Sequence, residues 1–197
     1  MAGQTVPQET HPAPEPEPVP APSGTADGAP ACSAPLARLR EIRHLVHANN
    51  RSCLPDELIV CQIYMESRFD KCAQAEGSSA RGLMQLLTVA NRELSRLDNL
   101  CKPPAQRCAE PALYAEADAF HASPAFIDEA TNIQMGTRYL QALIDKARRE
   151  KRADPIAEAY MDYRGVRNGI YYRKISAAAE RLKRDPDDIE ALRAMTA

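Results

Sequence analysis

Glu66 is the side chain with the clearest chemical potential, because it ends an apolar helical segment. It follows Ile59 by seven residues and Ile63 by three, so a helix places all three on one face. Burial disfavours the ionised carboxyl, and the negative end of the helix dipole also raises its pKa. Such a group can donate a proton near neutral pH, as acid-catalysed cleavage of a glycosidic bond requires. Periodicity alone leaves open an exposed or arginine-paired glutamate at the helix end.

A glycine-containing segment, Gly82-Leu-Met-Gln85, lies sixteen residues beyond Glu66 and follows the small residues 77–80. By itself, Gly82 predicts a tight turn into a core helix. With Glu66 upstream, a second interpretation is available. The small side chains let the backbone approach a ligand closely, and the Gln85 amide offers a donor and an acceptor to sugar groups.

Four groups of residues resemble, in the same order, the motifs of the soluble lytic transglycosylase and goose-type lysozyme superfamily. They are residues 65–70, residues 80–86, residues 128–133 with 136–140, and residues 159–160 with 172–175. The match covers about residues 53–177, and the combination is more specific than any single motif. The resemblance implies a lysozyme-like helical fold. It also implies cleavage of the β-1,4 bond between N-acetylmuramic acid and N-acetylglucosamine in peptidoglycan.

The resemblance also implies roles for single residues. Glu66 matches the catalytic acid/base of the family. The residues expected to bind substrate are Ser67, Met84, Gln85, Tyr160, Arg164 and Tyr172. No metal or other cofactor is expected.

The chain departs from the family pattern after residue 159. Met161 stands where the family usually has asparagine, and two extra residues precede Gly165. Thr88 replaces a proline that is common after the glycine-containing segment. The longer connection is expected to bring Asp162 and Arg164 near the substrate.

The number of carboxylates in the cleft determines which mechanism follows. Glu66 alone can protonate the leaving oxygen and then take the proton of the muramoyl 6-hydroxyl, which gives a 1,6-anhydro product. A second carboxylate lets water attack, and a separation of roughly 6.5–9.5 Å indicates inversion. Asp70, one turn beyond Glu66 if the helix continues, and Asp162 are the candidates. A helix-end charge and a loop ion pair are their ordinary alternatives, so hydrolysis and transglycosylation both stay open.

The elements that position these residues are predicted to be helices, because β-branched residues are sparse and Trp is absent. Periodicity and capping signals predict about seven helices, over residues 33–49, 55–66, 81–97, 128–149 and 166–182, and opening at Asp154-Pro155 and Asp185-Pro186. The 55–66 helix is apolar on nearly all sides and should lie at the centre. Residues 98–125 hold four prolines and read as a long excursion. We expect no β-sheet beyond a small β-hairpin, either in this segment or near residues 70–80.

Residues 1–31 differ in composition from the rest of the chain, since they hold eight of its 16 prolines. We expect a disordered leader over 1–31, either a passive linker or a docking or export element, and a catalytic domain over 32–197. The net charge of −2 gives no global basic field, so nucleic-acid binding is not expected. No apolar run reaches the roughly 20 residues of a membrane span.

The cysteines indicate the redox state of the cellular compartment in which the protein works. Their spacing does not suit zinc, so we expect disulfides, with buried free thiols as the alternative. The six are Cys32, Cys53, Cys61, Cys72, Cys101 and Cys108. Cys101 and Cys108 close a short loop and are the first pair to test. Disulfides persist in oxidising compartments, yet residues 1–30 contain no apolar signal-peptide core.

This combination resembles the antibacterial effectors of the type VI secretion apparatus. We therefore expect a monomer, exported without a signal peptide, that acts on peptidoglycan in the periplasm of a target cell. A periplasmic immunity protein that occludes the cleft is the expected protein partner. The alternatives are a phage-type endolysin and an inactive lysozyme-like module that binds glycan or scaffolds a secretion channel. The intact Glu66, Ser67 and Gln85 disfavour the inactive module.

Overall fold

Eight α-helices and two short 3₁₀ helices form the part of the chain that the computed structural model describes, residues 34–196. The predicted all-α fold is confirmed for these residues, which belong to one compact unit, Cys32–Ala197. The leader predicted over residues 1–31, the boundary at residue 32 and Cys32 lie outside the described residues. The expected small hairpin reduces to two isolated bridges, Gln74 to Arg81 and Arg81 to Leu86.

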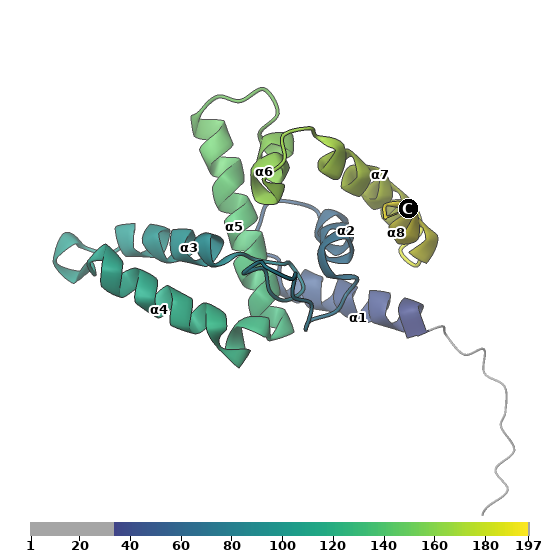
Figure 1. The fold of residues 1–197 in the computed structure, drawn as a ribbon. Coiled ribbons are helices and arrows are strands. Elements are labelled where there is room, and N and C mark those ends of the chain that lie inside the picture. The colour runs from purple at the N-terminus through teal and green to yellow at the C-terminus, as the bar shows by residue number, and fades with distance from the viewer. Residues whose placement is uncertain (1–33, 197) are drawn as a thin grey trace, which may run out of the picture. The chain divides into compact units, whose positions relative to one another are not determined.

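The long helix α5 (Glu129–Arg149) separates two groups of helices (Figure 1). In chain order the α-helices are α1 (Ala34–Asn49), α2 (Asp56–Ser67), α3 (Thr88–Leu100), α4 (Glu110–Ala122), α5 (Glu129–Arg149), α6 (Pro155–Arg164), α7 (Ile170–Arg184) and α8 (Ile189–Ala194). Helix α5 packs against α1, α3 and α6. The 3₁₀ helices η1 (Pro104–Gln106) and η2 (Pro124–Ile127) flank α4. Helices α3 and α4 lie on one side of α5, and α2, α7 and α8 lie on the other (Figure 1).

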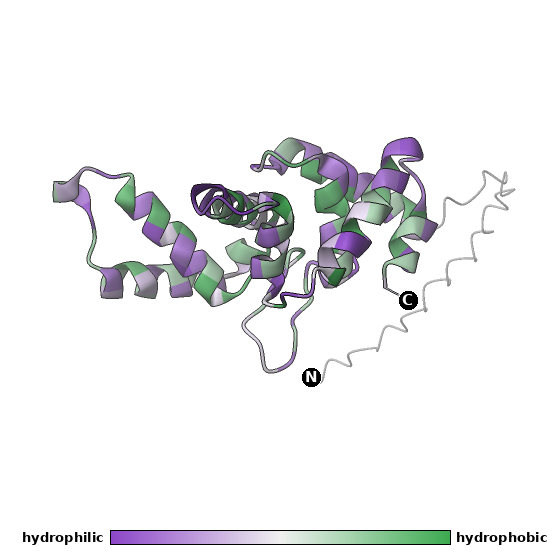
Figure 2. Ribbon diagram, turned by 90° about the horizontal axis from the view of Figure 1, so that it is seen from above, coloured by the Kyte–Doolittle hydropathy of each residue, from purple (hydrophilic) through white to green (hydrophobic). Residues whose placement is uncertain are grey.

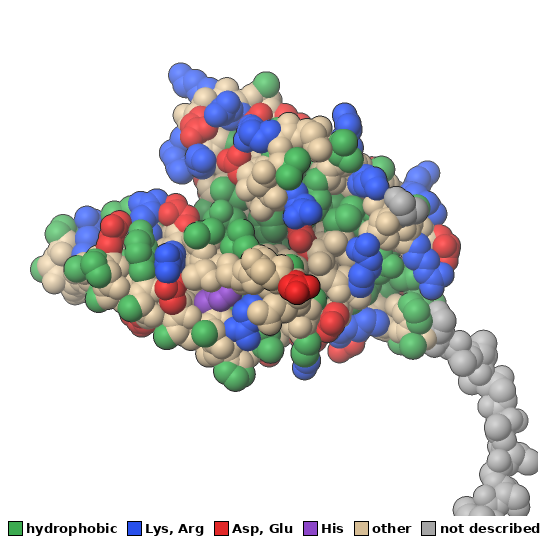
Figure 3. Space-filling view, viewed as in Figure 1, with side chains coloured by type: hydrophobic (Ala, Val, Ile, Leu, Met, Phe, Trp, Pro, Cys, Tyr) green, Lys and Arg blue, Asp and Glu red, His purple; other side chains and the backbone are tan. Residues whose placement is uncertain are grey.

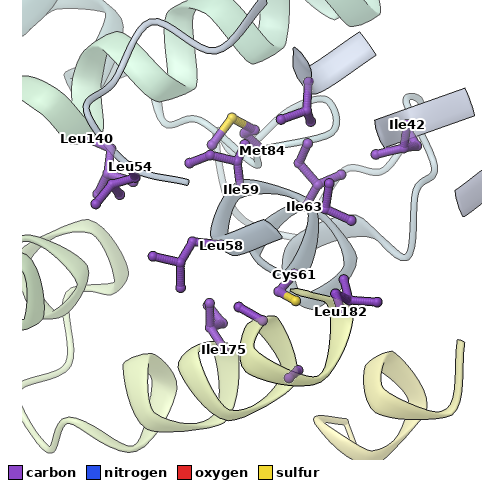
Figure 4. Packing of buried hydrophobic residues seen from close by; sticks show 14 of the residues in the cluster. Ile42, Leu54, Leu58, Ile59, Cys61, Ile63, Met84, Leu140, Ile175 and Leu182 are labelled. Carbon is purple, nitrogen blue, oxygen red and sulfur yellow. The ribbon is translucent and has the colours of Figure 1, made fainter. Parts of the chain in front are cut away.

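Helix α2 lies at the centre of the larger hydrophobic core, as its all-round apolar pattern predicts. Ile59 and Ile63 are fully buried, and the helix packs against α1 and α7. Figure 4 shows Ile59 directed toward Met84 while Cys61 faces Leu182 on the other side of the helix. Burial of each aliphatic side chain contributes about 1.5–3 kcal/mol. The helix that carries Glu66 is therefore held rigidly on several sides.

Aspartate caps begin three of the later helices. The Asp154 carboxylate accepts hydrogen bonds from two backbone amides of α6, at 3.1 and 3.0 Å, and Pro155 occupies its first turn, as predicted. Asp128 caps α5 in the same way. The predicted start of the last helix at Asp185 is wrong, because Asp188 is the residue whose carboxylate caps α8, through the amide of Ala191.

Residues 98–125 are predicted to be a long irregular excursion, and this is wrong, because they contain helix α4, which packs against α3 as a helical hairpin. Helix α4 begins Glu110-Pro111, so its proline falls in the first turn, where no backbone N–H is needed. The hairpin is closed by the Arg92–Asp118 ion pair and by the Asn91 amide, which donates to the Ala117 carbonyl at 2.6 Å. Both of its helices carry hydrophobic as well as hydrophilic residues along their length (Figure 2).

Two predicted helix starts are too early. Helix α3 begins at Thr88, not near residue 81, because residues 82–86 form a turn in which Gly82 and Gln85 have φ of 78° and 46°. Helix α7 begins at Ile170, because the Asn168 side chain accepts the Ile170 amide at 3.0 Å and holds the preceding residues in a loop.

The five cysteines within residues 34–196 are all free, so the expected disulfides among them, Cys101–Cys108 included, are absent from this part of the chain. Cys61 is buried, and its burial, with Glu57 nearby, raises its thiol pKa well above the ordinary value. Asn99 holds the loop between α3 and α4 instead, through two hydrogen bonds of 3.0 Å with the Cys108 backbone. Among helices of the described range, none has the length and apolar character that a membrane span needs.

Replacing Tyr160 by Phe is expected to stabilise the fold. The Tyr160 hydroxyl is fully buried and has no hydrogen-bond partner among the described residues. A buried hydroxyl without a partner costs about 1–3 kcal/mol, so its removal should raise the melting temperature by roughly 2–12 °C. Tyr163→Phe is the matched control. Its hydroxyl donates to the Met84 carbonyl at 2.6 Å, so the control should melt at a lower temperature. Equal shifts in the two variants would contradict the assignment.

Candidate active site

Glu66 lies in the last turn of α2, which ends abruptly after Ser67. Arg68 and Phe69 both adopt left-handed backbone conformations, with φ of 55° and 68°. Phe69 is buried against Tyr64, with ring centroids 5.1 Å apart, and this packing holds the unusual backbone in place. Two consecutive non-glycine residues with positive φ are rare, and such strain concentrates at functional sites. Because the chain turns away after Ser67, the Glu66 carboxyl lies at the C-terminal end of α2.

The Glu66 carboxyl faces a cleft of about 500 Å³. The cleft is lined by Met65, Glu66, Ala75, Ser78, Ala80, Gln85, Leu87, Tyr163, Arg164 and Tyr171. Glu66 itself is half-buried. Desolvation of its carboxyl raises the pKa above the usual range, and this outweighs the hydrogen bond from Tyr171 and the charge of Arg164, which both lower the pKa. The cleft therefore holds a carboxyl suited to donate a proton.

Tyr171 orients the Glu66 carboxyl. Its hydroxyl, on α7, donates a hydrogen bond of 2.5 Å to Glu66 Oε1 across 105 residues of sequence. Burial, and then the nearby Glu66, raise the pKa of Tyr171 well above its ordinary value, so the phenol stays a proton donor at neutral pH. Tyr171 was not among the residues predicted from the sequence, which included its neighbour Tyr172. Consecutive residues of a helix point in directions about 100° apart, so Tyr171 and Tyr172 face different surroundings.

Helix α5 holds the turn at residues 82–86 against the cleft. The Asn132 side chain accepts the Met84 amide at 2.8 Å and donates to the carbonyls of Arg81 and Phe126 at 3.3 and 3.2 Å. Gly136 lets the turn approach the helix, because a Cβ at that position would lie 2.3 Å from the Met84 sulfur. Asn132 and Gly136 of α5 thus support the turn.

Gln85 lies in the cleft, as the sequence analysis expected, but its amide is engaged. Its Nε2 donates to the carbonyls of Ala73 at 2.7 Å and Gly82 at 2.9 Å. These hydrogen bonds connect the turn at residues 82–86 to Ala73, at the start of the loop that contains the small residues 77–80. The side-chain carbonyl oxygen of Gln85 is the atom left to accept a hydrogen bond from a ligand.

Four other residues expected to bind substrate do not line this cleft. The Ser67 hydroxyl is buried and donates to the Ile63 carbonyl of its own helix at 3.0 Å. Met84 and Tyr160 are fully buried in the core. Tyr172 stacks on Tyr160 with ring centroids 4.9 Å apart. The cleft has Tyr163 instead, one helical turn beyond Tyr160, and sequence reasoning missed it.

Neither candidate second carboxylate lies in the cleft. Helix α2 ends before Asp70, which is exposed and accepts the Cys72 amide at 2.8 Å. Asp162 forms ion pairs with Lys146 and Arg167, at 3.4 and 2.5 Å. Both residues thus have the ordinary roles of a turn-stabilising charge and an ion-pair partner. Within residues 34–196, Glu66 is the one carboxyl that lines the cleft.

Arg164 lines the cleft, as expected, and is the other charged side chain in its wall. It occupies the last position of α6, and the left-handed Gly165 that follows ends the helix. Outside the cleft, on the face shown in Figure 3, acidic and basic side chains are interspersed. Within the lining of the cleft, Glu66 is the acidic side chain and Arg164 is the basic one.

A second hollow of similar volume, about 520 Å³, lies between α1, the start of α2 and the α7–α8 connection. Its charged groups largely neutralise one another, since Arg40 and Arg43 contact Asp187, and His47 contacts Asp56. The hydrogen bond from Arg40 holds the pKa of the Asp187 carboxyl below the usual range, which does not suit proton donation. The Glu66 cleft is therefore the candidate active site.

Replacing Tyr171 by Phe is expected to lower the rate of a reaction that uses Glu66 by about 10- to 100-fold. A hydrogen bond to a charged group contributes about 1.5–3 kcal/mol, and Tyr171 also aims the carboxyl. This bond favours the ionised form, so its loss raises the Glu66 pKa. The decline of activity with rising pH should move to higher pH. Tyr172→Phe is the neighbouring control and should leave the pH profile in place; a shift in the control alone would contradict the assignment.

Comparison of this chain with protein-family models, with curated proteins and with solved structures found no match.

Proposed function

We propose that this protein cleaves the β-1,4 bond between N-acetylmuramic acid and N-acetylglucosamine in peptidoglycan, as a lytic transglycosylase. The observation that carries the proposal is Glu66, a half-buried carboxyl with a raised pKa in an open cleft. The resemblance of the surrounding motifs to the lytic transglycosylase and goose-type lysozyme superfamily gives the substrate class.

The proposed reaction begins with protonated Glu66. Its proton passes to the glycosidic oxygen as the bond from that oxygen to C1 of the muramoyl sugar breaks, and N-acetylglucosamine leaves with a 4-hydroxyl. The carboxylate of Glu66 then accepts the proton of the muramoyl 6-hydroxyl while O6 bonds to C1. The product is a 1,6-anhydro sugar, no water is consumed, and Glu66 regains its proton.

Transglycosylation is preferred over inverting hydrolysis, because a water that attacks the face opposite the leaving oxygen needs a second carboxylate as its base. Glu66 is the one carboxyl of the described cleft lining, while Asp70 and Asp162 have partners elsewhere. In the transglycosylation route one carboxyl performs both proton transfers. Tyr171 supports this double role, because it hydrogen bonds the ionised form without neutralising it.

The biological setting forms a further part of the proposal. A wall-cleaving enzyme acts where peptidoglycan is, so we propose a monomeric antibacterial effector that reaches the periplasm of a target cell. An immunity protein that occludes the Glu66 cleft would protect the producing cell. Expression directed to the periplasm of a test bacterium should lyse it, and cytoplasmic expression should not. Equal growth in both cases would contradict this setting.

Product analysis tests the reaction. Purified peptidoglycan is incubated with the protein, or with Glu66→Gln as the inactive control, and the released muropeptides are identified by mass spectrometry. Anhydro-muramoyl ends from the native protein alone support transglycosylation. Reducing muramoyl ends would show hydrolysis instead. Binding without cleavage would favour the inactive glycan-binding module.

A further inference from the structure

Arg164 places a positive charge in the cleft, and the proposed reaction at Glu66 assigns no step to it. Its side chain is exposed, and its guanidinium forms no hydrogen bond or ion pair with a described residue. Other arginines nearby are engaged: Arg167, for example, pairs with Glu158 and Asp162. Arg164 is therefore available to a ligand.

The charge of Arg164 is balanced only by Glu66. The eight other residues of the lining are uncharged. A proton-donating Glu66 is neutral, so the cleft then presents one uncompensated positive charge near Glu66. A guanidinium in such a site binds a carboxylate well, because its planar donors match two carboxylate oxygens.

We propose that Arg164 selects glycan strands that carry a free carboxylate close to the bond that is cleaved. The inference rests on the proposed function for its substrate and extends it to a recognised group. Two carboxylates of the same strand have the required chemistry. One is the lactyl carboxylate of a muramic acid that has lost its peptide, and the other belongs to a stem peptide still attached.

Binding measurements can test the selection without turnover. The protein carries Glu66→Gln, and its affinity is compared with and without Arg164→Gln. Three ligands are used: peptide-free glycan strands prepared with an amidase, intact strands of the same length, and a β-1,4-linked N-acetylglucosamine oligomer that has no carboxylate. Arg164→Lys keeps the charge without the planar fork. Arg193→Gln removes a charge from α8, where Arg193 pairs with Glu190 on the surface.

Arg164→Gln is expected to weaken binding of the recognised strand about 10- to 100-fold, as for loss of a charged hydrogen bond. Binding of the neutral oligomer should change by less than about two-fold, Arg164→Lys should recover part of the loss, and Arg193→Gln should have no effect. Selective loss on peptide-free strands assigns the lactyl carboxylate, and selective loss on intact strands assigns the stem peptide. Equal loss on all three ligands, or none on any, overturns the proposal. Failure of the native protein to cleave peptidoglycan would count against the proposed function alone, because this readout is binding.

Discussion

Replacing Glu66 by Gln is expected to reduce cleavage of peptidoglycan by at least about 10²–10⁴-fold, the usual contribution of general acid catalysis. Glutamine has nearly the same shape but cannot donate the proton that the leaving oxygen needs. Initial rates of muropeptide release measure the effect. Glu190→Gln is the matched control, because Glu190 is exposed on α8 and pairs there with Arg193. Similar rates for the native protein and Glu66→Gln would eliminate Glu66 as the catalytic acid.

The same variant is expected to be more stable than the native protein at neutral pH. Folding raises the pKa of Glu66, so the folded state holds its proton more tightly than the unfolded state. The stabilisation from that proton is complete below the ordinary glutamate pKa. It is lost as the pH rises through the raised pKa of the folded state. The gap in melting temperature between Glu66→Gln and the native protein should therefore widen with pH over that range, and a constant gap would contradict the raised pKa.

Replacing Asn132 by Ala is expected to have the largest effect on stability. The substitution leaves the Met84 amide and the carbonyls of Arg81 and Phe126 without their partner. Buried groups of this kind cost about 1–3 kcal/mol each, so a loss of about 3 kcal/mol is a conservative sum. For a domain of this size the melting temperature should fall by roughly 6–12 °C. Calorimetry or thermal circular dichroism measures the change.

The same substitution should also lower activity, because the released turn carries Gln85 and accepts the Tyr163 hydroxyl. Displacement of a binding group by about 1 Å can cost up to about 100-fold in rate. Asn99→Ala is the matched control, since it removes two hydrogen bonds of 3.0 Å from the tip of the α3–α4 hairpin. The control should lose stability and keep its activity. A parallel loss of activity in both variants would indicate general unfolding.

The helical fold follows largely from local sequence. The all-round apolar pattern of residues 55–66 predicts a central helix, and Asp154-Pro155 predicts a helix start, because both signals act within one or two turns of backbone. Helix α4 is not predicted, because the four prolines and two cysteines of residues 98–125 indicate a loop. In the structure one of these prolines, Pro111, occupies a first turn, and the neighbouring hairpin partner α3 stabilises the segment.

The sequence by itself determined where Glu66 lies, at the end of a buried helix, because helical periodicity is a local property. Only the tertiary structure decided what surrounds its carboxyl. Tyr171 reaches it across 105 residues, and Arg164 and Tyr163 arrive with α6, through packing of helices that are distant in the chain. The same packing buries Tyr160 and turns Asp162 toward Lys146 and Arg167. Which side chain of a helix faces a cleft depends on its rotation in the core, and that rotation is set by long-range contacts that no local pattern encodes.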